Sequence, residues 1–155
     1  FFSIDTNTIF PPKLEFAWDD SSFSTGSLEE LTSEDNIIYF KNLRREYVDG
    51  ERVRFRIVGR ERFPTRSYTT TLQSLDTKFL PTSSYYAIKD GHTDDFVVPY
   101  DTSYTKISCD SNGSYFDIRT DGLQPNRYYR FLIKTERNGL IDICDDGFFF
   151  KIKKN

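Results

Sequence analysis

The chain has 155 residues, a length that suits one domain or two very small ones. Aromatic residues make up 17% of it, which argues against disorder, and no apolar run approaches the roughly 18 residues of a membrane-spanning helix. The formal net charge is −3, whereas a nucleic-acid-binding protein is usually strongly basic. Because the chain begins at Phe1 and contains no Met, we expect it to be a piece of a longer product.

Apolar and polar residues alternate with a period of two along most of the sequence, and this pattern predicts strands. The first expected strands are residues 13–20, 37–40 and 52–58, the last of which follows an Asp49-Gly50 turn. Residues 19–35 are rich in Ser, Asp, Thr and Gly, and they predict a loop with one helical turn at 27–31. Further strands are expected at 67–72, 85–89, 96–99, 105–108, 115–119, 128–136, 140–143 and 148–153, between Asn-Gly and Asp-Gly turns.

Short strands at this spacing predict an all-β protein, a β-sandwich or a barrel. A polar stretch that ends at Pro81 leaves two arrangements open. One is an N-terminal β module of residues 1–74 followed by a sandwich of residues 75–155. The other is a single sandwich with an elaborated N-terminal half.

The stretch LQPNRYYRFLIK, residues 123–134, places a Leu, a Pro and a Tyr pair before an alternating strand. It resembles the E–F corner of fibronectin type III and other immunoglobulin-like sandwiches, where the Leu plugs the core and a Tyr bonds back across the loop. The resemblance implies Leu123 and Tyr128 as the corner pair, with Tyr128 bonding and Tyr129 facing the other side. With the strand pattern, it predicts an immunoglobulin-like or jelly-roll-like sandwich, at least in residues 75–155.

A broader resemblance covers most of residues 36–139. The run from YYAIKDGHTDDFVVPY to FLIKTERNG, and the upstream NIIYFKNLRREYVDGERVRFRIVGRERFPTRSY, are similar to virion structural proteins of contractile-tailed phages, particularly marine ones. The resemblance implies a location in the virion, as a neck, tail, baseplate or capsid-associated subunit. Its partners would be other virion proteins and copies of itself, with no membrane involved.

Residues 41–66 carry nine Lys or Arg and four Asp or Glu, a local charge of +5, and the remaining residues sum to −8. Alternate residues of a strand stand about 6.6 Å apart on one face, so the arginines of residues 52–56 form a row. Three interpretations stay open: a solvated face with local ion pairs, a protein interface, and a phosphate-binding face. The carboxylates expected to meet the row are Asp94-Asp95 or Asp145-Asp146, within or between subunits. The candidate interface residues are Arg52, Arg54, Arg56, Arg60, Arg62 and Arg66, and charge reversal at Arg54 and Arg56 is expected to weaken association but not folding.

No motif for catalysis, a metal or a cofactor stands out. There is no GxSxG, His92 is alone in a turn, and the DICDDG run at 142–147 lacks the spacing of a calcium loop. Cys109 and Cys144 are too few for zinc, and the pattern favours two buried free thiols over a disulfide. We therefore expect a non-enzymatic protein without a cofactor.

The alternative hypothesis is a carbohydrate-binding β-sandwich module of a host-adhesion or extracellular protein, since such modules stack sugars on aromatic rings. The rings that could form the platform are Trp18, Tyr39, Tyr47, Tyr85 and Tyr86. The non-alternating run Phe148-Phe149-Phe150 predicts a strand that is covered on both faces, which in an assembly means packing on a neighbour.

Overall fold

The structure is a computed structural model that describes residues 19–32, 35–64 and 77–154. Within these residues there are nine strands and one short 3-10 turn, η1 (Thr120–Gly122). The strands are β1 (Asn36–Phe40), β2 (Glu46–Val48), β3 (Arg52–Glu61), β4 (Ser84–Asp90), β5 (Phe96–Val98), β6 (Ser108–Asp110), β7 (Gly113–Arg119), β8 (Tyr128–Arg137) and β9 (Leu140–Lys153).

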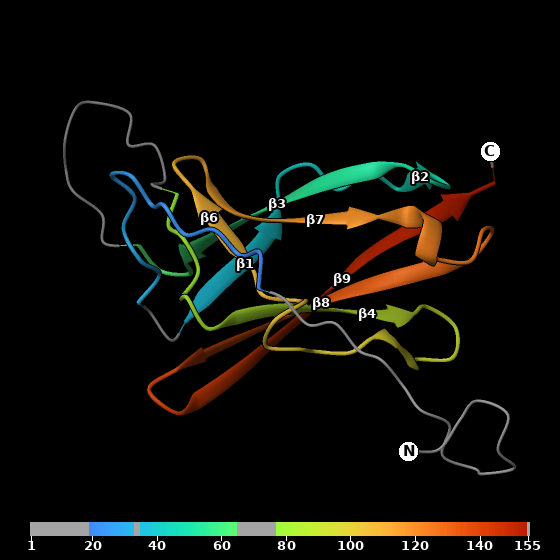
Figure 1. Ribbon diagram of the computed structural model, residues 1–155. Coiled ribbons are helices and arrows are strands. Elements are labelled where there is room, and N and C mark those ends of the chain that lie inside the picture. The colour runs from blue at the N-terminus through green and yellow to red at the C-terminus, as the bar shows by residue number, and fades with distance from the viewer. Residues whose placement is uncertain (1–18, 33–34, 65–76, 155) are drawn as a thin grey trace, which may run out of the picture.

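The strands form two sheets that pack against each other (Figure 1). One sheet has the order β1-β3-β7-β6, and the other has the order β2-β9-β8-β4-β5. The prediction of an all-β sandwich is confirmed. Of the two sandwich types expected, the strand order matches the immunoglobulin-like one. In the four-stranded sheet β1, β3, β7 and β6 take the places of strands A, B, E and D. In the other sheet β9, β8 and β4 take the places of strands G, F and C.

Strands from either side of the expected boundary at residue 74 pair with each other in both sheets. β3 pairs with β7 in an antiparallel register, and β2 pairs in parallel with the end of β9. Both halves also contribute to one hydrophobic core. In the described residues the second arrangement, a single sandwich, is therefore the one observed, while the expected strand at 67–72 and most of that at 13–20 lie outside them.

Aromatic rings fill the space between the sheets, and their large area lets a chain with only 37% hydrophobic residues build this core. Phe131 of β8 is completely buried, with ring centroids 4.6 Å from Phe150, 4.8 Å from Phe55 and 5.5 Å from Phe116. Offset and edge-to-face pairs of this kind add to the free energy gained by burial of apolar area. The core thus depends on rings from both sheets.

Three local expectations differ from the structure. The strand expected at 105–108 begins three residues later, as β6. No helix is present at residues 27–31, where the backbone makes only a turn at 26–27. The two strands expected at 140–143 and 148–153 are one long strand, β9, because the run Asp145-Asp146-Gly147 makes a bulge opposite β8 instead of a chain reversal. Gly147 has a φ of +71°, which glycine adopts without the steric cost that a Cβ would bring.

Candidate functional site

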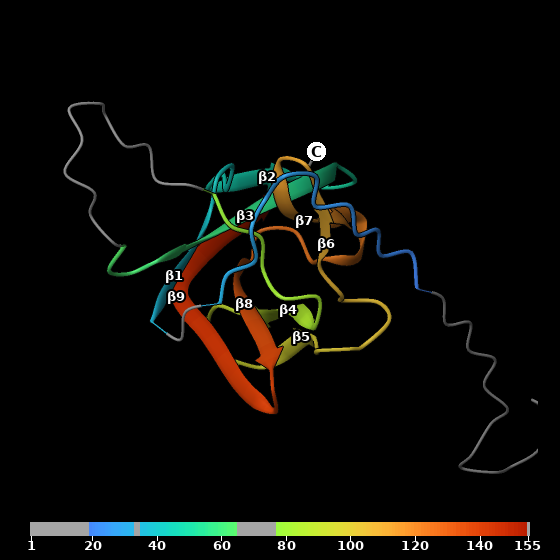
Figure 2. The ribbon, with the colours of Figure 1, turned by 90° about the vertical axis from the view of Figure 1, so that its left-hand side faces the viewer.

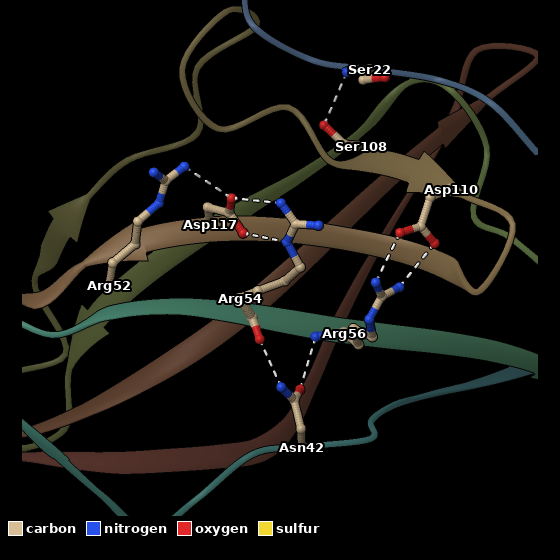
Figure 3. A network of polar contacts seen from close by, with 8 residues as sticks. All are labelled: Ser22, Asn42, Arg52, Arg54, Arg56, Ser108, Asp110 and Asp117. Carbon is tan, nitrogen blue, oxygen red and sulfur yellow. Dashed lines mark hydrogen bonds and ion pairs between the residues drawn. The ribbon is translucent and has the colours of Figure 1, made fainter.

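The arginine row predicted from the sequence lies on the outer face of β3, next to β7 and β6 (Figure 3). Arg54 stands opposite Asp117 of β7 and donates two hydrogen bonds to its carboxylate, from Nε at 2.8 Å and from Nη2 at 3.0 Å. Arg52 donates to the same carboxylate at 3.3 Å. One aspartate therefore serves two arginines.

Arg56 spans the neighbouring strand to reach its partner. Its two Nη atoms donate to Asp110 of β6 at 2.9 and 2.8 Å, a bidentate pair. The ring of Tyr115 on β7 lies close to both arginines. Its centroid is 4.2 Å from the guanidinium carbon of Arg54 and 5.6 Å from that of Arg56. These contacts join three strands on one face through charge and cation–π attraction.

The pairing changes the protonation behaviour of both carboxyls. Hydrogen bonds from Arg54 hold the pKa of Asp117 below its ordinary value, and hydrogen bonds from Arg56 do the same for Asp110. Three arginines facing two carboxylates leave this cluster a net charge of +1, so most of its positive field is already neutralised inside the chain. The arginines meet Asp110 and Asp117, not the Asp94-Asp95 or Asp145-Asp146 pairs expected from the sequence. We therefore expect charge reversal at Arg54 and Arg56 to destabilise the fold, in contrast to the expectation from the sequence alone.

The remaining candidate arginines do not join this cluster. Arg60 continues the row on β3, half-buried, and its Nη1 donates to the neighbouring carbonyl of Glu61 at 3.4 Å. Arg62 is exposed beyond the end of the strand, and its backbone N–H donates to the carbonyl of Asp35 at 2.9 Å. Arg66 lies outside the described residues.

Asn42 is a structural residue of this face that the sequence analysis missed. β1 ends at Phe40, and beyond it the side chain of Asn42 takes over the hydrogen bonding to β3. Its Nδ2 donates to the carbonyl of Arg54 at 2.7 Å, and its Oδ1 accepts from the N–H of Arg56 at 2.9 Å (Figure 3). An Asn in a loop is a common signal for side-chain bonding to backbone, but its partner cannot be read from the sequence.

The corner predicted at residues 123–128 is present, but with the other tyrosine. Leu123 is 5% exposed and belongs to the core, as expected. Tyr129, only 1% exposed, donates its hydroxyl to the carbonyl of Gln124 at 3.0 Å, whereas Tyr128 is 47% exposed. The assignment of Tyr128 as the bonding residue is therefore wrong, because Tyr129 shares the inward face of β8 with Phe131 and Ile133.

The five-stranded sheet has a different surface from the arginine face. Several large apolar side chains of β5, β8 and β9 are about half exposed or more, and β9 holds most of them. Phe149 is 46% exposed while its neighbour Phe150 is buried, so only one side of the Phe148–150 run is covered in the described chain. The exposed apolar residues are Phe96, Val97, Tyr128, Leu140, Ile141, Ile143 and Phe149.

The two free cysteines are poor nucleophiles. Burial raises the pKa of the Cys109 thiol to about 11, and burial together with the carboxylate of Asp146 raises that of Cys144 to about 12. Since the thiolate is the reactive form, neither group is activated at neutral pH. The two cysteines lie on different sheets, Cys109 on β6 and Cys144 on β9.

His92 belongs to a structural turn. Its backbone N–H donates to Oδ1 of Asp90 at 2.8 Å, and the buried Asp90 carboxylate also accepts from Arg127 at 2.7 Å. Backbone hydrogen bonds to its carboxylate, including the one from His92, hold the pKa of Asp90 below its ordinary value. Among the described residues there is no group of three or more side chains that could hold a metal ion, and no helix long and apolar enough to cross a membrane.

The aromatic platform considered for carbohydrate binding is not assembled in the described residues. Tyr47 and Tyr86 are buried in the core, at 1% and 8% exposure. Tyr39 and Tyr85 belong to different sheets, and Trp18 lies outside the described residues. No two of these five rings therefore form an exposed row in the described residues.

No family model matches the chain, and neither a curated protein nor a solved structure matches it.

Proposed function

We propose that this chain is a non-enzymatic structural subunit of a tailed-phage virion, in the tail, neck, baseplate or capsid-associated layer, and that it acts through protein–protein contacts. The resemblance drawn from the sequence, between most of residues 36–139 and such virion proteins, motivates the proposal. The structural observation that carries it is the concentration of exposed apolar side chains on β9, where Leu140, Ile141 and Ile143 are 64%, 60% and 51% exposed. Clustered apolar surface of this kind is typical of interaction sites.

The arrangement of the two outer faces supports the same function. On the four-stranded sheet the charged groups of Arg54, Arg56, Asp110 and Asp117 pair with each other, so most of the charge of that face is balanced within the chain. On the five-stranded sheet the hairpin of β8 and β9 runs out beyond the other strands and carries its apolar residues with it (Figures 1 and 2). Contacts to other virion proteins are therefore expected at β9 and the β8–β9 hairpin, and less at the arginine row.

The test is the composition of the particle. Virions of the phage that encodes the chain would be purified on a density gradient, washed in high salt and quantified by mass spectrometry. We expect the chain at a fixed copy number relative to the major capsid protein. Its absence from washed, infectious particles would refute the proposal.

A glycan array with the purified chain distinguishes the virion subunit from the alternative function, a carbohydrate-binding module. Because no row of exposed rings is assembled in the described residues, we expect no glycan to bind. Specific, saturable binding of one glycan class would favour a carbohydrate-binding module instead.

A further inference from the structure

The long strand β9 has a free edge. On one side it pairs with β8 along most of its length, with a bulge at residues 145–147. On its other side β2 covers only Lys151, Ile152 and Lys153, in parallel register. Among the strands that the structure describes, none pairs with the outer side of residues 140–149.

The backbone of this edge is available for hydrogen bonding. Asn138 and Gly139, with φ of +50° and +79°, form a two-residue turn between the paired residues Arg137 and Leu140. In such a hairpin the residues that flank the turn exchange hydrogen bonds, and the pattern then alternates. The N–H and C=O groups of Ile141 and Ile143 therefore point away from β8, toward the free edge.

The other edges in the described part of the sandwich are shorter than this one or covered. β1 has five residues and β5 has three. β6 is covered by the segment around Phe23, where the N–H of Ser24 donates to the carbonyl of Cys109 and the N–H of Cys109 donates to the carbonyl of Ser22. Native edge strands are usually protected by charged side chains, especially Lys, by Pro or by bulges, and the bulge at residues 145–147 protects only part of this edge. Residues 140–150 contain no Lys, Arg or Pro, and instead expose Leu140, Ile141 and Ile143.

Two hollows lie at the ends of the free edge. A groove of about 240 Å³ at the hairpin is lined by Leu31, Pro81, Leu140 and Ile141, among others. A hollow of about 350 Å³ at the other end is lined by apolar residues and by two cations: Leu43, Arg44, Arg45, Tyr128, Phe148 and Phe149, among others. Leu140 and Phe149 pair with Arg137 and Arg130 of β8, which are seven residues apart. At roughly 3.3 Å per residue the edge therefore spans about 23 Å, so an extended segment of eight residues would reach both hollows. Added strands gain affinity from main-chain hydrogen bonds and specificity from such side-chain pockets.

The acidic residues of β9 favour a basic binding partner over a second copy of the chain. Residues 140–150 carry Asp142, Asp145 and Asp146 and no cation, and of these Asp145 lies 3.4 Å from Arg130 of β8. A second copy that paired here edge to edge would bring acidic segments together, and like charges across a strand pair are destabilising. A strand that alternates Lys or Arg with apolar residues would match both the acids and the apolar side chains.

We infer that the outer edge of β9 binds an extended, basic and apolar segment of another protein, which adds to the five-stranded sheet as a further strand. This inference rests on the proposed function, since it names the contact through which the subunit would attach.

The test uses two labelled, acetylated eight-residue peptides and the full chain. In one peptide Lys alternates with Ile, and in the other Glu replaces Lys. Fluorescence anisotropy should show saturable binding of the Lys peptide, weakened by salt, and at least tenfold weaker binding of the Glu peptide. Hydrogen exchange should show new protection of the amides of Ile141 and Ile143 when the Lys peptide is bound.

A matched pair of variants locates the site. Ile143→Lys places a cation on the free edge at a half-exposed position and should weaken binding of the Lys peptide at least tenfold. Val97→Lys makes the same kind of change on β5, at the opposite edge of the same sheet, and should leave binding unchanged. Circular dichroism and thermal unfolding confirm that both variants fold, and if Ile143→Lys does not, Asp142→Lys replaces it.

Equal binding of the two peptides, equal loss in both variants, or binding without protection of the β9 amides would each overturn the inference. A concentration-dependent dimer that Ile143→Lys abolishes would overturn it in favour of a second copy. If the Lys peptide does not bind but the chain is a stoichiometric part of the virion, the inference fails while the proposed function stands.

Discussion

Replacing Tyr129 by Phe removes one hydroxyl from the corner before β8 and leaves the aromatic ring in place. The hydroxyl donates to the carbonyl of Gln124 at 3.0 Å, and the ring, 1% exposed, lies 5.6 Å from that of Phe150. A typical intramolecular hydrogen bond contributes about 0.5–1.5 kcal/mol net. Because Gln124 is exposed, water can reach its freed carbonyl, so we expect a loss of about 1 kcal/mol rather than more. For a chain of this length that corresponds to a fall in Tm of about 3 °C.

The assay is urea denaturation followed by fluorescence, with Tyr128→Phe as the matched control. Tyr128 is 47% exposed and its ring is retained in the variant, so its unfolding free energy should stay within about 0.5 kcal/mol of the wild type. The slope of the free energy with urea should be the same in all three proteins, since the surface exposed on unfolding does not change. Equal losses in the two variants, or a larger loss for Tyr128→Phe, would refute the assignment of Tyr129 as the corner residue.

Three further outcomes follow from the packing and the ion pairs. Asp110→Asn removes the bidentate partner of Arg56 and should cost about 1 kcal/mol at neutral pH and low salt. The pKa of Asp110 is lower in the folded state, so its ionised carboxylate stabilises the fold fully above the unfolded-state pKa of about 3.9. This stabilisation is lost as the pH falls through the folded-state pKa. In urea denaturation the difference in unfolding free energy between the variant and the wild type should therefore shrink below about pH 4. Phe131→Ala should cost about 4 kcal/mol in urea denaturation, since the ring is completely buried, and Phe149→Ala less than about 1 kcal/mol; similar costs would contradict the described core. Iodoacetamide should label Cys144 slowly at pH 8 in the native chain and rapidly in urea, because its thiol pKa is about 12 in the fold; equal rates would contradict the burial of the thiol.

The sequence by itself determined the fold class and much of the core. Alternation of apolar and polar residues is a local property, since successive side chains of a strand point to opposite faces. It therefore identified the buried positions Val53, Phe55 and Ile57, opposite the arginines of residues 52–56, while the resemblance to an immunoglobulin-like corner implied Leu123 as the plug. The same rule, applied from Phe131 and Ile133 backward, would have selected Tyr129 over Tyr128.

Only the tertiary structure decided which residues meet across strands. Asp110 and Asp117 lie 54 and 63 residues from Arg56 and Arg54, and no local pattern relates them until β3, β7 and β6 are placed side by side. The bulge at residues 145–147 has the same cause, since an Asp-Asp-Gly run is equally suited to a turn or to a bulge. Pairing with β8 selected the bulge, and the resulting long β9 with its free edge is therefore a property of the sheet and not of the strand alone.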